Sequence, residues 1–557
     1  MRVLPLLTSV CSITWCLTGL FAKEKVPDQK LFGIRVLSLN LVDPMEIAVV
    51  EGGRVFIAER TGTVKLFDPE TRKTDSVLTL EVAKRRGAFA RECGLLGIAA
   101  HPRFQENAWV YLFYSAPGKE GKQRISRFTF VKDKLDASSE KIVLEFANDR
   151  DRGACHEGGS MAFGPEGNLY LSTGDNTNPF ESNGYGPIDE RAERRWFDAQ
   201  RSSANPNDLR GKIIRIKPTD DGGYDVPVGN LFPKGEKGTR PEIYAMGCRN
   251  PFRISVDQGS GDLFWGEVGP DSGRDGDRGP QGYCEINRAA TAGYYGWPYF
   301  VADNKAYADF DFKSRKVGEK FDAENPRNES PNNSGKAELP PARTPIHFYP
   351  RSCAMAGPVY RPKGKMPVGA FSGHYAGKLF FYDWNRGWFK TLRFDEEGKV
   401  AEITNFLGHR KFTRPMDVEF GVDGRMYILE YGVGWYDNKD GRLLVLTYGA
   451  GDAPVGGGVG NDPRFAGIDL EHPGAKIMAK SDCIACHLAD RRVVGPSFRE
   501  IRTKYVADPK ALHNLAKKVL KGGKGVWGPV PMPPHPFHTL DESREMVRLM
   551  LSPLKGN

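Results

Sequence analysis

GSMAFGPEGNLYLSTGDN, residues 159–176, is the stretch that decides the fold. It consists of an apolar run, a turn containing Pro and Gly, a second run rich in Tyr and Leu, and an exit made of Gly and Asp. Apolar and aromatic residues favour strands, whereas Gly and Pro favour the turn between them. The segment therefore predicts two adjacent antiparallel strands that end in a polar loop.

The same pattern returns further along and before this stretch, at 47–62, 96–118, 253–271, 357–387 and 416–434. Six copies leave roughly 70 residues for each unit, which is room for a four-stranded blade and its loops. Radial repetition closes such blades into a ring and protects the strand edges that an open sheet exposes. We therefore expect an all-β six-bladed β-propeller over residues 30–449, with the acidic exits gathered at one face. A long β-sandwich is the alternative, but it does not require the same exit after each second strand.

Composition agrees with many short strands. Of the 557 residues, 39% are apolar and 27% are charged, which excludes a wholly disordered chain and a polytopic membrane protein. The 64 Gly and 39 Pro accompany 32 Phe and 20 Tyr, a combination that suits tight turns better than long helices. The net charge is +9, and residues 471–557 hold 15 Lys+Arg against 8 Asp+Glu. No Arg-rich arm accompanies this basic block, so we expect no nucleic acid as its partner, and either an anionic protein or the surface of the chain's own body as its target.

The first 22 residues are typical of a secretory signal peptide. Arg2 precedes an apolar stretch, and a charged run follows Ala22. An uncleaved anchor is the alternative, because about 20 apolar residues can cross a bilayer. The Thr and Ser residues within the stretch disfavour it. We therefore expect a periplasmic or otherwise exported protein with no stable membrane span once residues 1–22 are removed.

Two long polar stretches interrupt the repeats, at 181–208 and 301–350. Loops of this length are functional lids or disordered inserts, and we favour lids over the face that carries the exits. After the last repeat, residues 449–460 read GAGDAPVGGGVG, which is typical of a flexible linker. We therefore expect a Gly-rich linker over 450–470 and a separate C-terminal domain over 471–557.

The C-terminal domain carries a motif with its own chemistry, CIACH. Cys483 and Cys486 provide two thiols for thioether bonds to a porphyrin, and His487 provides an imidazole for its iron. A redox or zinc pair is the alternative for an isolated Cys-x-x-Cys. Here capping boxes at Ser497 and Thr539 predict short helices around the motif. The pattern indicates a small all-α domain around one covalent haem.

This domain resembles the class I monohaem cytochromes c. The resemblance is carried by Cys-x-x-Cys-His, a following Gly-Pro, and GVWGPVPMPP. It implies that His487 and Met532 are the axial ligands of the iron, although a core-packing Met is the ordinary alternative. It also implies that the other ring N–H of His487 is donated to the carbonyl of Pro496, which fixes the tautomer of the ring.

The body carries a second ordered set of motifs: GLLGIAAHP, CHEGGSMAFGPEGNLYLSTGDN, NDLRGKIIRI, RPEIYAMGCRNPFRISVD, GEVGPD, CEIN and YYGWPYF. Together they resemble the soluble quinoprotein sugar dehydrogenases, the glucose/sorbosone dehydrogenase family, over most of residues 40–445. The resemblance implies a six-bladed propeller that uses pyrroloquinoline quinone (PQQ) with calcium. It extends to the branch of the family that is often fused to cytochrome c.

Alcohol oxidation by hydride transfer has requirements of its own. It needs a base for the hydroxyl proton, a cation beside the quinone oxygen that gains charge, and cations for the carboxylates of the cofactor. The resemblance implies that His156 is the base, that Asp175 orients it, and that Arg249 and Asn250 face the quinone. A structural loop histidine and a surface Arg-Asn turn are the alternatives.

The resemblance also assigns the calcium ligands. The main-chain carbonyls of Gly269 and Pro270 match the family's ligands, and oxygen donors suit this hard cation. Glu92 stands where the family often has a Gln that contacts PQQ.

The cations for the PQQ carboxylates agree with the family only in part. Arg414 matches one carboxylate-binding Arg. Asn385-Arg386 stands where the family has a Lys-Arg pair, and Arg386 can supply the charge of that pair. Met416 occupies the place of a second Arg, so one cation is missing. Arg nevertheless carries much of the recognition of a tricarboxylate, and PQQ remains the expected cofactor.

Two functions fit these features. The first is an exported quinohaemoprotein oxidoreductase that oxidises a sugar or other alcohol with PQQ. It passes single electrons to its fused haem and then to an external acceptor such as a soluble cytochrome or oxidase. The second is a propeller that binds carbohydrate or protein without turnover and carries a haem for electron transfer or sensing, because a propeller fold alone implies no chemistry. The five cysteines of the body allow at most two disulfides, with the pairing left open: Cys93, Cys155, Cys248, Cys284 and Cys353.

Overall fold

The computed structural model describes the following residues: 26–83, 92–150, 155–410, 412–433, 436–449, 467–478, 483, 487–492, 495–523, 525–528, 532, 535 and 538–554. The signal peptide expected over 1–22, most of the linker expected over 450–470, and Cys486 lie outside these residues.

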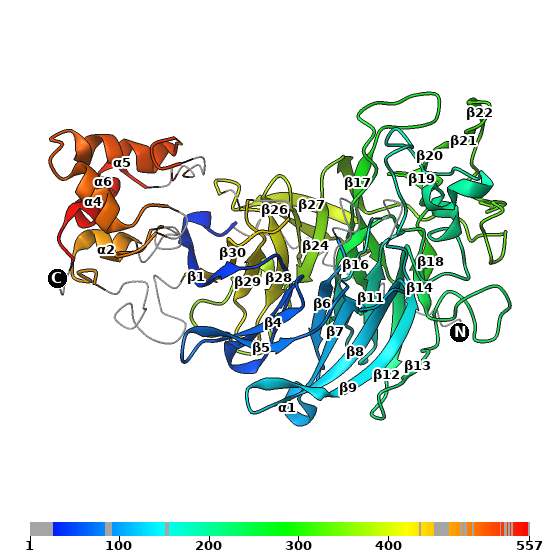
Figure 1. Cartoon of the computed structure of the whole chain (residues 1–557), viewed down its shortest axis with the longest axis horizontal. Helices are drawn as coiled ribbons and strands as arrows, with labels where there is room; N and C mark the ends of the chain where they lie inside the picture. Colours follow the sequence, from blue (N-terminus) through cyan, green and yellow to red (C-terminus); the bar gives the residue numbers. More distant parts are fainter. Residues whose placement is uncertain are drawn as a thin grey trace, which may run out of the picture.

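Six sheets packed around a common axis form the body of the molecule (Figure 1), so the prediction of a six-bladed β-propeller is confirmed. In each blade the first strand lies innermost and contacts the first strands of its neighbours. The strands of blades one to three are β2 (Pro44–Val49), β3 (Val55–Glu59), β4 (Thr63–Asp68), β5 (Lys73–Thr79); β6 (Leu95–Ala100), β7 (Trp109–Ser115), β8 (Lys122–Val131), β9 (Lys134–Ala147); and β10 (Met161–Phe163), β11 (Leu169–Thr173), β12 (Lys212–Pro218), β14 (Ile243–Met246).

The remaining blades follow the same order. Their strands are β15 (Pro251–Val256), β16 (Leu263–Glu267), β17 (Tyr283–Ala289), β23 (His347–Pro350); β24 (Ala354–Val359), β25 (Leu379–Asp383), β26 (Trp388–Phe394), β27 (Val400–Phe406); and β28 (Pro415–Phe420), β29 (Met426–Glu430), β30 (Gly441–Tyr448), β1 (Phe32–Leu41). Two short strands extend blade three: β13 (Tyr224–Asp225) pairs with β12, and β18 (Gly293–Tyr294) runs parallel to β14. Each repeat found in the sequence corresponds to the two innermost strands of one blade.

The ring is closed by its N-terminal strand. β1 pairs antiparallel with β30 as the outermost strand of blade six, and Phe32 lies opposite Tyr448. The ring of Phe32 lies edge-on to Phe371 and Phe406 with centroid distances of 5.0 Å. The two ends of the propeller are therefore joined by backbone hydrogen bonds and by aromatic packing.

Carboxylates lie along the inner edges of the blades. Glu46 of β2 accepts hydrogen bonds from the amides of Ile98 in β6 at 2.7 Å and Met161 in β10 at 3.1 Å. Asp417 of β28 accepts one from Ile47 in β2 at 2.8 Å. Side chains of one blade thus satisfy the exposed backbone edge of another. Burial raises the pKa of Glu46 to about 8.

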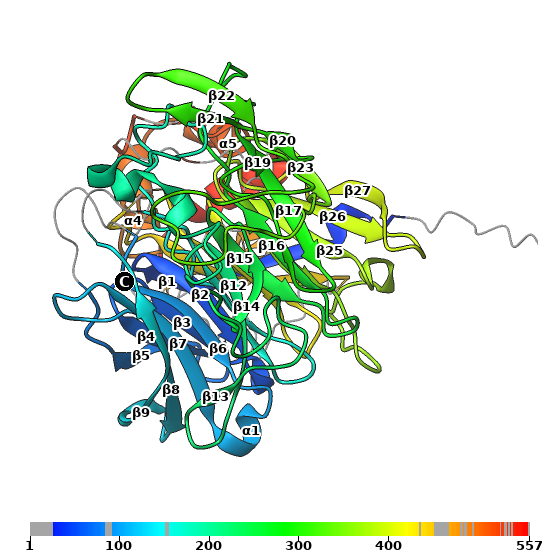
Figure 2. The ribbon, with the colours of Figure 1, turned by 90° about the vertical axis from the view of Figure 1, so that its right-hand side faces the viewer.

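The two polar inserts contain short elements and pack against each other. These elements are η3 (Ala192–Phe197) and η4 (Ala199–Arg201) in the first insert, and the hairpins β19 (Phe300–Val301) with β20 (Lys305–Ala306) and β21 (Ala308–Asp311) with β22 (Lys316–Lys320) in the second. Ser330 and Asn332 both donate hydrogen bonds to the buried carboxylate of Asp198, at 2.7 and 2.9 Å. The β21–β22 hairpin projects from the body (Figure 2). A lid function for these inserts stays a prediction.

The C-terminal helices form a cluster of their own (Figure 1): α2 (Pro473–Met478), α4 (Phe498–Tyr505), α5 (Ala511–Lys521) and α6 (Leu540–Leu551). Both expected capping boxes are present, at Ser497 and Thr539. Helix α5 begins at Ala511, and Lys510 is its N-cap residue. The carboxylate of Asp508 accepts the N–H of Lys510 at 2.8 Å, which turns the chain before the helix.

The described helices, including the short α1 (Phe104–Asn107), are too short or too polar to span a bilayer. No disulfide joins the described cysteines of the propeller: Cys93, Cys155, Cys248, Cys284 and Cys353.

Candidate active site

The residues expected around PQQ lie at one end of the propeller. In each blade the first strand starts, and the antiparallel second strand ends, at the same end of the sheet. Glu92, His156, Arg249, Asn250 and Arg414 precede first strands, and Asp175, Gly269, Pro270 and Arg386 follow second strands. Loops from several blades therefore bring these residues to one end of the propeller, which we call the mouth.

His156 and Asp175 form a buried hydrogen-bonded pair. Nδ1 of His156 lies 2.7 Å from Oδ1 of Asp175, and the two residues are 6% and 0% exposed. The same oxygen accepts the backbone N–H of Thr177 at 3.0 Å. A carboxylate can only accept, so Nδ1 carries the proton, and Nε2 keeps its lone pair in the neutral ring. This is the arrangement of a general base held by an orienting carboxylate.

Trp297 completes the contacts of Asp175, and the sequence analysis did not assign it a role. Its indole N–H donates to Oδ2 of Asp175 at 2.8 Å. Trp297 is 4% exposed, and its backbone N–H donates to Gly247 at 3.0 Å, just before Arg249. The signal in the sequence was the motif YYGWPYF, which carried a resemblance without a function.

The backbone around His156 explains why its segment is rich in glycine. His156 itself has φ +68°, a conformation that residues with a side chain rarely adopt. A Cβ on Gly174 would lie 2.0 Å from the carbonyl oxygen of His156, so only glycine permits this approach. Strained residues of this kind gather at functional sites.

Glu92 and Asn250 both hold this segment rather than projecting freely from it. Oε2 of Glu92 accepts the backbone N–H of His156 at 2.8 Å and that of Glu157 at 3.2 Å. Oδ1 of Asn250 accepts the N–H of Gly158 at 3.1 Å. Both residues therefore position the backbone of the base, and a contact with PQQ stays a prediction.

Arg249 lies beside the His–Asp pair. Its guanidinium carbon is 5.8 Å from the ring centroid of Trp297, Nη1 donates to the carbonyl of Val268 at 2.9 Å, and Nη2 lies 3.6 Å from Asp271. Its side chain is buried, and Nε has no hydrogen-bond partner among the described residues. Burial acts to lower the pKa of Arg249, but the charges of Asp271 and Asp175 raise it overall. Arg249 thus stays positively charged, and its Nε–H has no acceptor among the described residues.

Gly269 and Pro270 are buried at the exit of blade four. The approach is close, because a Cβ on Gly269 would lie 1.6 Å from the carbonyl oxygen of Tyr283. Neither carbonyl of the pair accepts a hydrogen bond from another described residue. Buried carbonyls without donors fit a hard cation such as calcium. The described residues contain no group of three or more His, Cys, Asp or Glu side chains suited to a metal.

Arg386 and Arg414 supply positive charge at the same mouth. Arg386 is exposed and donates to the carbonyls of Pro350 and Arg351 at 3.1 and 3.2 Å. Arg414 lies over the ring of Trp384, 4.7 Å from its centroid. Partial burial lowers the pKa of Arg414. Nη1 of Arg414 also donates to the carbonyl of Val433 at 2.7 Å.

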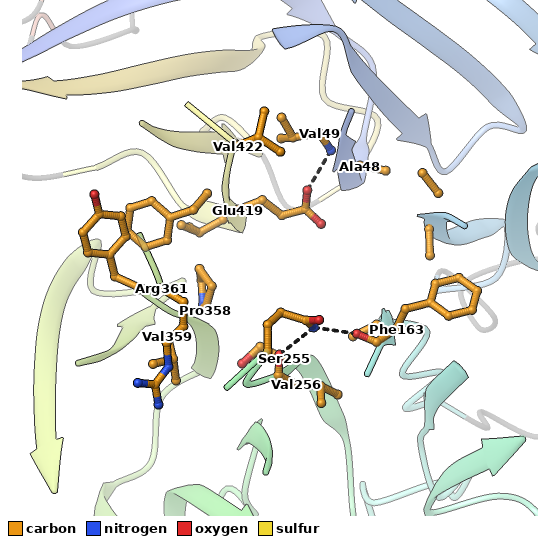
Figure 3. Close-up of a pocket in the computed structure, with 18 of the residues that line it drawn as sticks. Ala48, Val49, Phe163, Ser255, Val256, Pro358, Val359, Arg361, Glu419 and Val422 are labelled. Atoms are coloured by element: carbon orange, nitrogen blue, oxygen red, sulfur yellow. Dashed lines mark hydrogen bonds between the residues drawn. The ribbon is translucent and has the colours of Figure 1, made fainter. Parts of the chain in front are cut away.

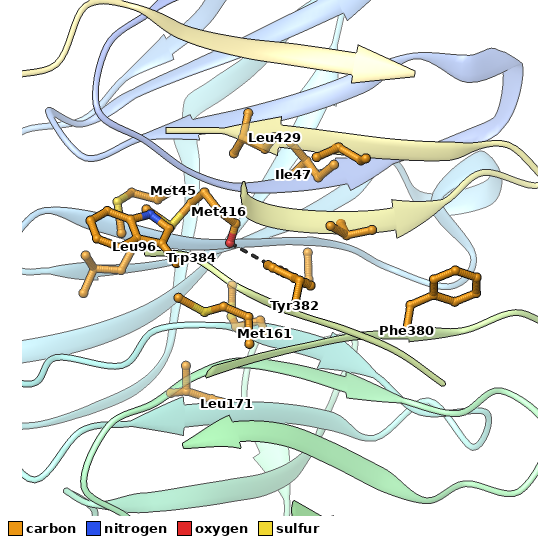
Figure 4. Packing of buried hydrophobic residues seen from close by; sticks show 14 of the residues in the cluster. Met45, Ile47, Leu96, Met161, Leu171, Phe380, Tyr382, Trp384, Met416 and Leu429 are labelled. Atoms are coloured by element: carbon orange, nitrogen blue, oxygen red, sulfur yellow. Dashed lines mark hydrogen bonds between the residues drawn. The ribbon is translucent and has the colours of Figure 1, made fainter. Parts of the chain in front are cut away.

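Met416 lies below the mouth, inside the packed core. It is 3% exposed and lies among Met45, Leu96 and Trp384 (Figure 4). Its carbonyl accepts a hydrogen bond from Nε of the buried Arg253 at 2.9 Å. The side chain at this position therefore packs the interior.

A cavity of about 420 Å³ lies at the end of the propeller opposite the mouth (Figure 3). It is lined by the ends of the first strands, including Phe163, Val256 and Val359. Glu419 points into it and accepts the N–H of Val49 at 2.7 Å. None of the residues predicted for PQQ lines this cavity, so it is separate from the candidate active site.

The haem motif is built around His487. Its Nδ1 lies 2.7 Å from the carbonyl of Pro496, which is the contact that the resemblance implies. Gly495 packs on the ring, and a Cβ there would lie 2.4 Å from Cε1 of His487. Cys483 and Met532 border the same apolar cluster, whereas Cys486 lies outside the described residues. Because Nδ1 of His487 faces the carbonyl of Pro496, Nε2 is the ring nitrogen that an iron would take.

The propeller carries a buried His–Asp pair and an arginine at one end, and a helical Cys-x-x-Cys-His domain follows it. These features define an oxidoreductase with an attached cytochrome c domain. The family described as Glucose / Sorbosone dehydrogenase matches residues 41–445. The chain belongs to this family, and its body is a propeller of the PQQ sugar dehydrogenase type.

Known proteins resemble the two parts separately. The aldose sugar dehydrogenase of Escherichia coli (strain K12) is 26% identical over 339 residues, covering 60% of this chain and 74% of that protein. Cytochrome c-551 of Stutzerimonas stutzeri is 34% identical over 98 residues, covering 18% of this chain and 88% of that protein. The crystal structure of the soluble aldose sugar dehydrogenase from Escherichia coli in its apo form covers 74% of this chain and 99% of that one. It has 22% identity and a TM-score of 0.51, and this likeness shows the fold alone.

Proposed function

We propose that this protein is an exported quinohaemoprotein dehydrogenase that oxidises a sugar or another alcohol with PQQ and delivers the electrons to its own haem. The observation that carries the proposal is the hydrogen bond between Nδ1 of His156 and Asp175, placed beside the buried guanidinium of Arg249. A base and a cation at one mouth are what alcohol oxidation requires.

The residues of the chain divide the chemistry between them. Nε2 of His156 accepts the hydroxyl proton of the substrate, and Asp175 stabilises the imidazolium that results. Arg249 stabilises negative charge that develops on an oxygen at the mouth. Bound PQQ supplies the two-electron acceptor for the hydride of the same alcohol. The buried setting of the pair keeps water from competing for the base.

The donor set at the mouth fits PQQ and calcium. The unused Nε of Arg249 and the exposed guanidinium of Arg386 suit carboxylate and quinone oxygens. Arg414 adds a further cation. The buried carbonyls of Gly269 and Pro270 suit calcium, and a PQQ carboxylate would complete its ligand shell.

The C-terminal domain suits a one-electron acceptor. His487 is oriented by Pro496, and Cys483 and Cys486 would hold one c-type haem covalently, with Met532 as the second axial ligand. Fusion raises the effective concentration of this acceptor near the mouth. The next acceptor is an external protein with an anionic surface, such as a soluble cytochrome or oxidase, because the domain is basic.

Dye reduction by the purified full chain tests the proposal. With PQQ, calcium and a panel of aldoses and simple alcohols, we expect bleaching of a redox dye that requires both PQQ and substrate. Retention of haem after denaturation and acid–acetone extraction tests the covalent bond. A protein that retains haem but oxidises none of the panel would favour a non-catalytic binding propeller.

A further inference from the structure

We propose that Trp297 is a positioning residue that fixes the tautomer of His156 through Asp175. This inference rests on the proposed function only for its kinetic consequence. The geometry involves three side chains in series: the indole N–H of Trp297, the carboxylate of Asp175 and the imidazole of His156.

The two oxygens of Asp175 have different partners. Oδ1 receives Nδ1–H of His156 and the N–H of Thr177, at 2.7 and 3.0 Å, whereas Oδ2 receives only the indole N–H of Trp297 among the described residues, at 2.8 Å. Asp175 is 0% exposed, so bulk solvent does not reach its carboxylate. Without the indole N–H, Oδ2 would be a buried, unpaired carboxylate oxygen, which is costly.

Such an oxygen can be relieved in two ways. The carboxyl group can rotate, which moves Oδ1 away from His156, or it can take up a proton. Either change removes the reason for Nδ1 to carry the proton, because a neutral or rotated carboxyl no longer selects that tautomer. The proton then resides on Nε2 in part of the molecules, and the base has no lone pair for the substrate.

Trp297 also contacts the second functional group. The guanidinium carbon of Arg249 lies 5.8 Å from the centroid of its ring, within the range of a cation–π contact. The backbone N–H of Trp297 donates to Gly247, two residues before Arg249. One residue therefore links the group that orients the base with the cation at the mouth.

Charged and titratable groups surround the pair, and none of them takes the place of the indole N–H. Glu92 accepts the backbone N–H of His156, and the buried Lys212 donates to the carbonyls of Ser202, Ser203 and Arg210. The other such groups near His156 and Asp175 are Cys155, Glu157, Arg249 and Glu267.

The test is Trp297→Phe, which removes the N–H and keeps an aromatic ring for Arg249. The matched control is Trp265→Phe, because Trp265 is also buried in the same propeller but its Nε1 has no hydrogen-bond partner among the described residues. Thermal unfolding of both variants shows whether each one folds.

The first readout does not require the cofactor. Long-range ¹H–¹⁵N spectra of full-length protein labelled at histidine report which ring nitrogen carries the proton, and His156→Ala assigns the signal. We expect the Nδ1–H tautomer in the parent and in Trp265→Phe, and a mixture of both tautomers in Trp297→Phe. An unchanged Nδ1–H tautomer in a folded Trp297→Phe protein would overturn the inference.

The second readout is steady-state turnover of the loaded enzyme. We expect kcat to fall about 10- to 100-fold in Trp297→Phe with KM changed less than about threefold, since a hydrogen bond to a charged group is lost but no substrate contact is. Trp265→Phe should retain the parent kcat. If the parent shows no turnover, the proposed function fails, and the tautomer measurement still decides the role of Trp297.

Discussion

Glu267, the last residue of β16, accepts a hydrogen bond from the backbone N–H of Arg249 at 3.1 Å, just before β15 of the same blade. The same oxygen accepts the N–H of Asn250. Equivalent carboxylates end other second strands and accept the amide just before the first strand: Glu59 from Val42, Asp383 from Cys353 and Glu430 from Thr413. In these four blades the acidic residue at the end of the second strand therefore has a structural cause, because it fixes the loop that starts the blade.

The carboxyl group of Glu267 makes stability depend on pH. Burial raises its pKa to about 8, and the amide of Asn250 opposes that shift. The folded state then binds a proton that the unfolded chain loses above about pH 4.5, so this contribution to stability is present at low pH and declines as pH rises toward 8. We expect Glu267→Gln to flatten that decline, because Oε1 accepts both backbone amides and the amide oxygen of Gln can replace it.

Urea unfolding of parent and variant between pH 5 and pH 8.5 measures this difference. Asp383→Asn is the comparison, since Asp383 ends the second strand of blade five and accepts the amide of Cys353 in the same way. An identical pH dependence in parent and Glu267→Gln would contradict the prediction.

Replacement of the base should affect turnover and leave the fold intact. His156→Gln removes the proton acceptor while the cavity around it stays filled, so we expect kcat to fall about 10²- to 10⁴-fold with PQQ binding retained. Stopped-flow mixing with excess substrate measures the step. Turnover within about threefold of the parent would exclude His156 as the base.

The interior position of Met416 predicts the outcome of restoring an arginine there. Met416→Arg would bury a second guanidinium near Arg253, which we expect to cost about 3–5 kcal/mol in the free energy of unfolding without tightening PQQ binding. Met416→Leu should cost less than about 1.5 kcal/mol. Chemical unfolding and a PQQ titration measure both quantities. A stable Met416→Arg protein with stronger PQQ binding would mean that this side chain turns to the mouth.

The contact between Gly495 and His487 predicts a haem defect. A methyl group on Gly495 would overlap the imidazole ring, so the ring must tilt away from Pro496. We expect Gly495→Ala to lower haem incorporation, or to shift the reduction potential in the haem-loaded fraction. Spectroelectrochemistry measures the potential. Ser497→Ala is the control, because it removes the nearby helix cap without touching the ring.

Electron delivery to the haem should be intramolecular. Because the two parts share one chain, we expect substrate-driven haem reduction to be first order and unaffected by dilution. Transfer to an external acceptor should be bimolecular and should slow in salt, since the Debye length falls from about 10 Å at 0.1 M to about 3 Å at 1 M. A rate of haem reduction proportional to protein concentration would indicate that electrons come from other molecules.

The sequence was sufficient for features set by local pattern. The strand pairs, the capping boxes at Ser497 and Thr539, and the proximity of His156 and Asp175 follow from repeats and motifs of fixed spacing. The family is also confirmed. The roles of the individual site residues stay predictions.

Contacts between distant segments could not be predicted in this way. Trp297 meets Asp175 across 122 positions of the chain, and Asp198 meets Ser330 across 132. Glu92 holds the backbone of His156, a partner that depends on the pairing of two blades. Nothing in the periodicity of either segment specifies such a partner, because it is set by the closure of the ring.

The closure of the ring through β1 and β30 also gives the protein an order of maturation. The strand that seals the last blade is made first, and its partner ends at Tyr448. During synthesis every intermediate chain therefore has an open seam with two unpaired strand edges, and such edges invite association with other chains. The haem module is made only after the seam can close. Any chain long enough to bind haem at Cys483 therefore already contains every strand of the propeller.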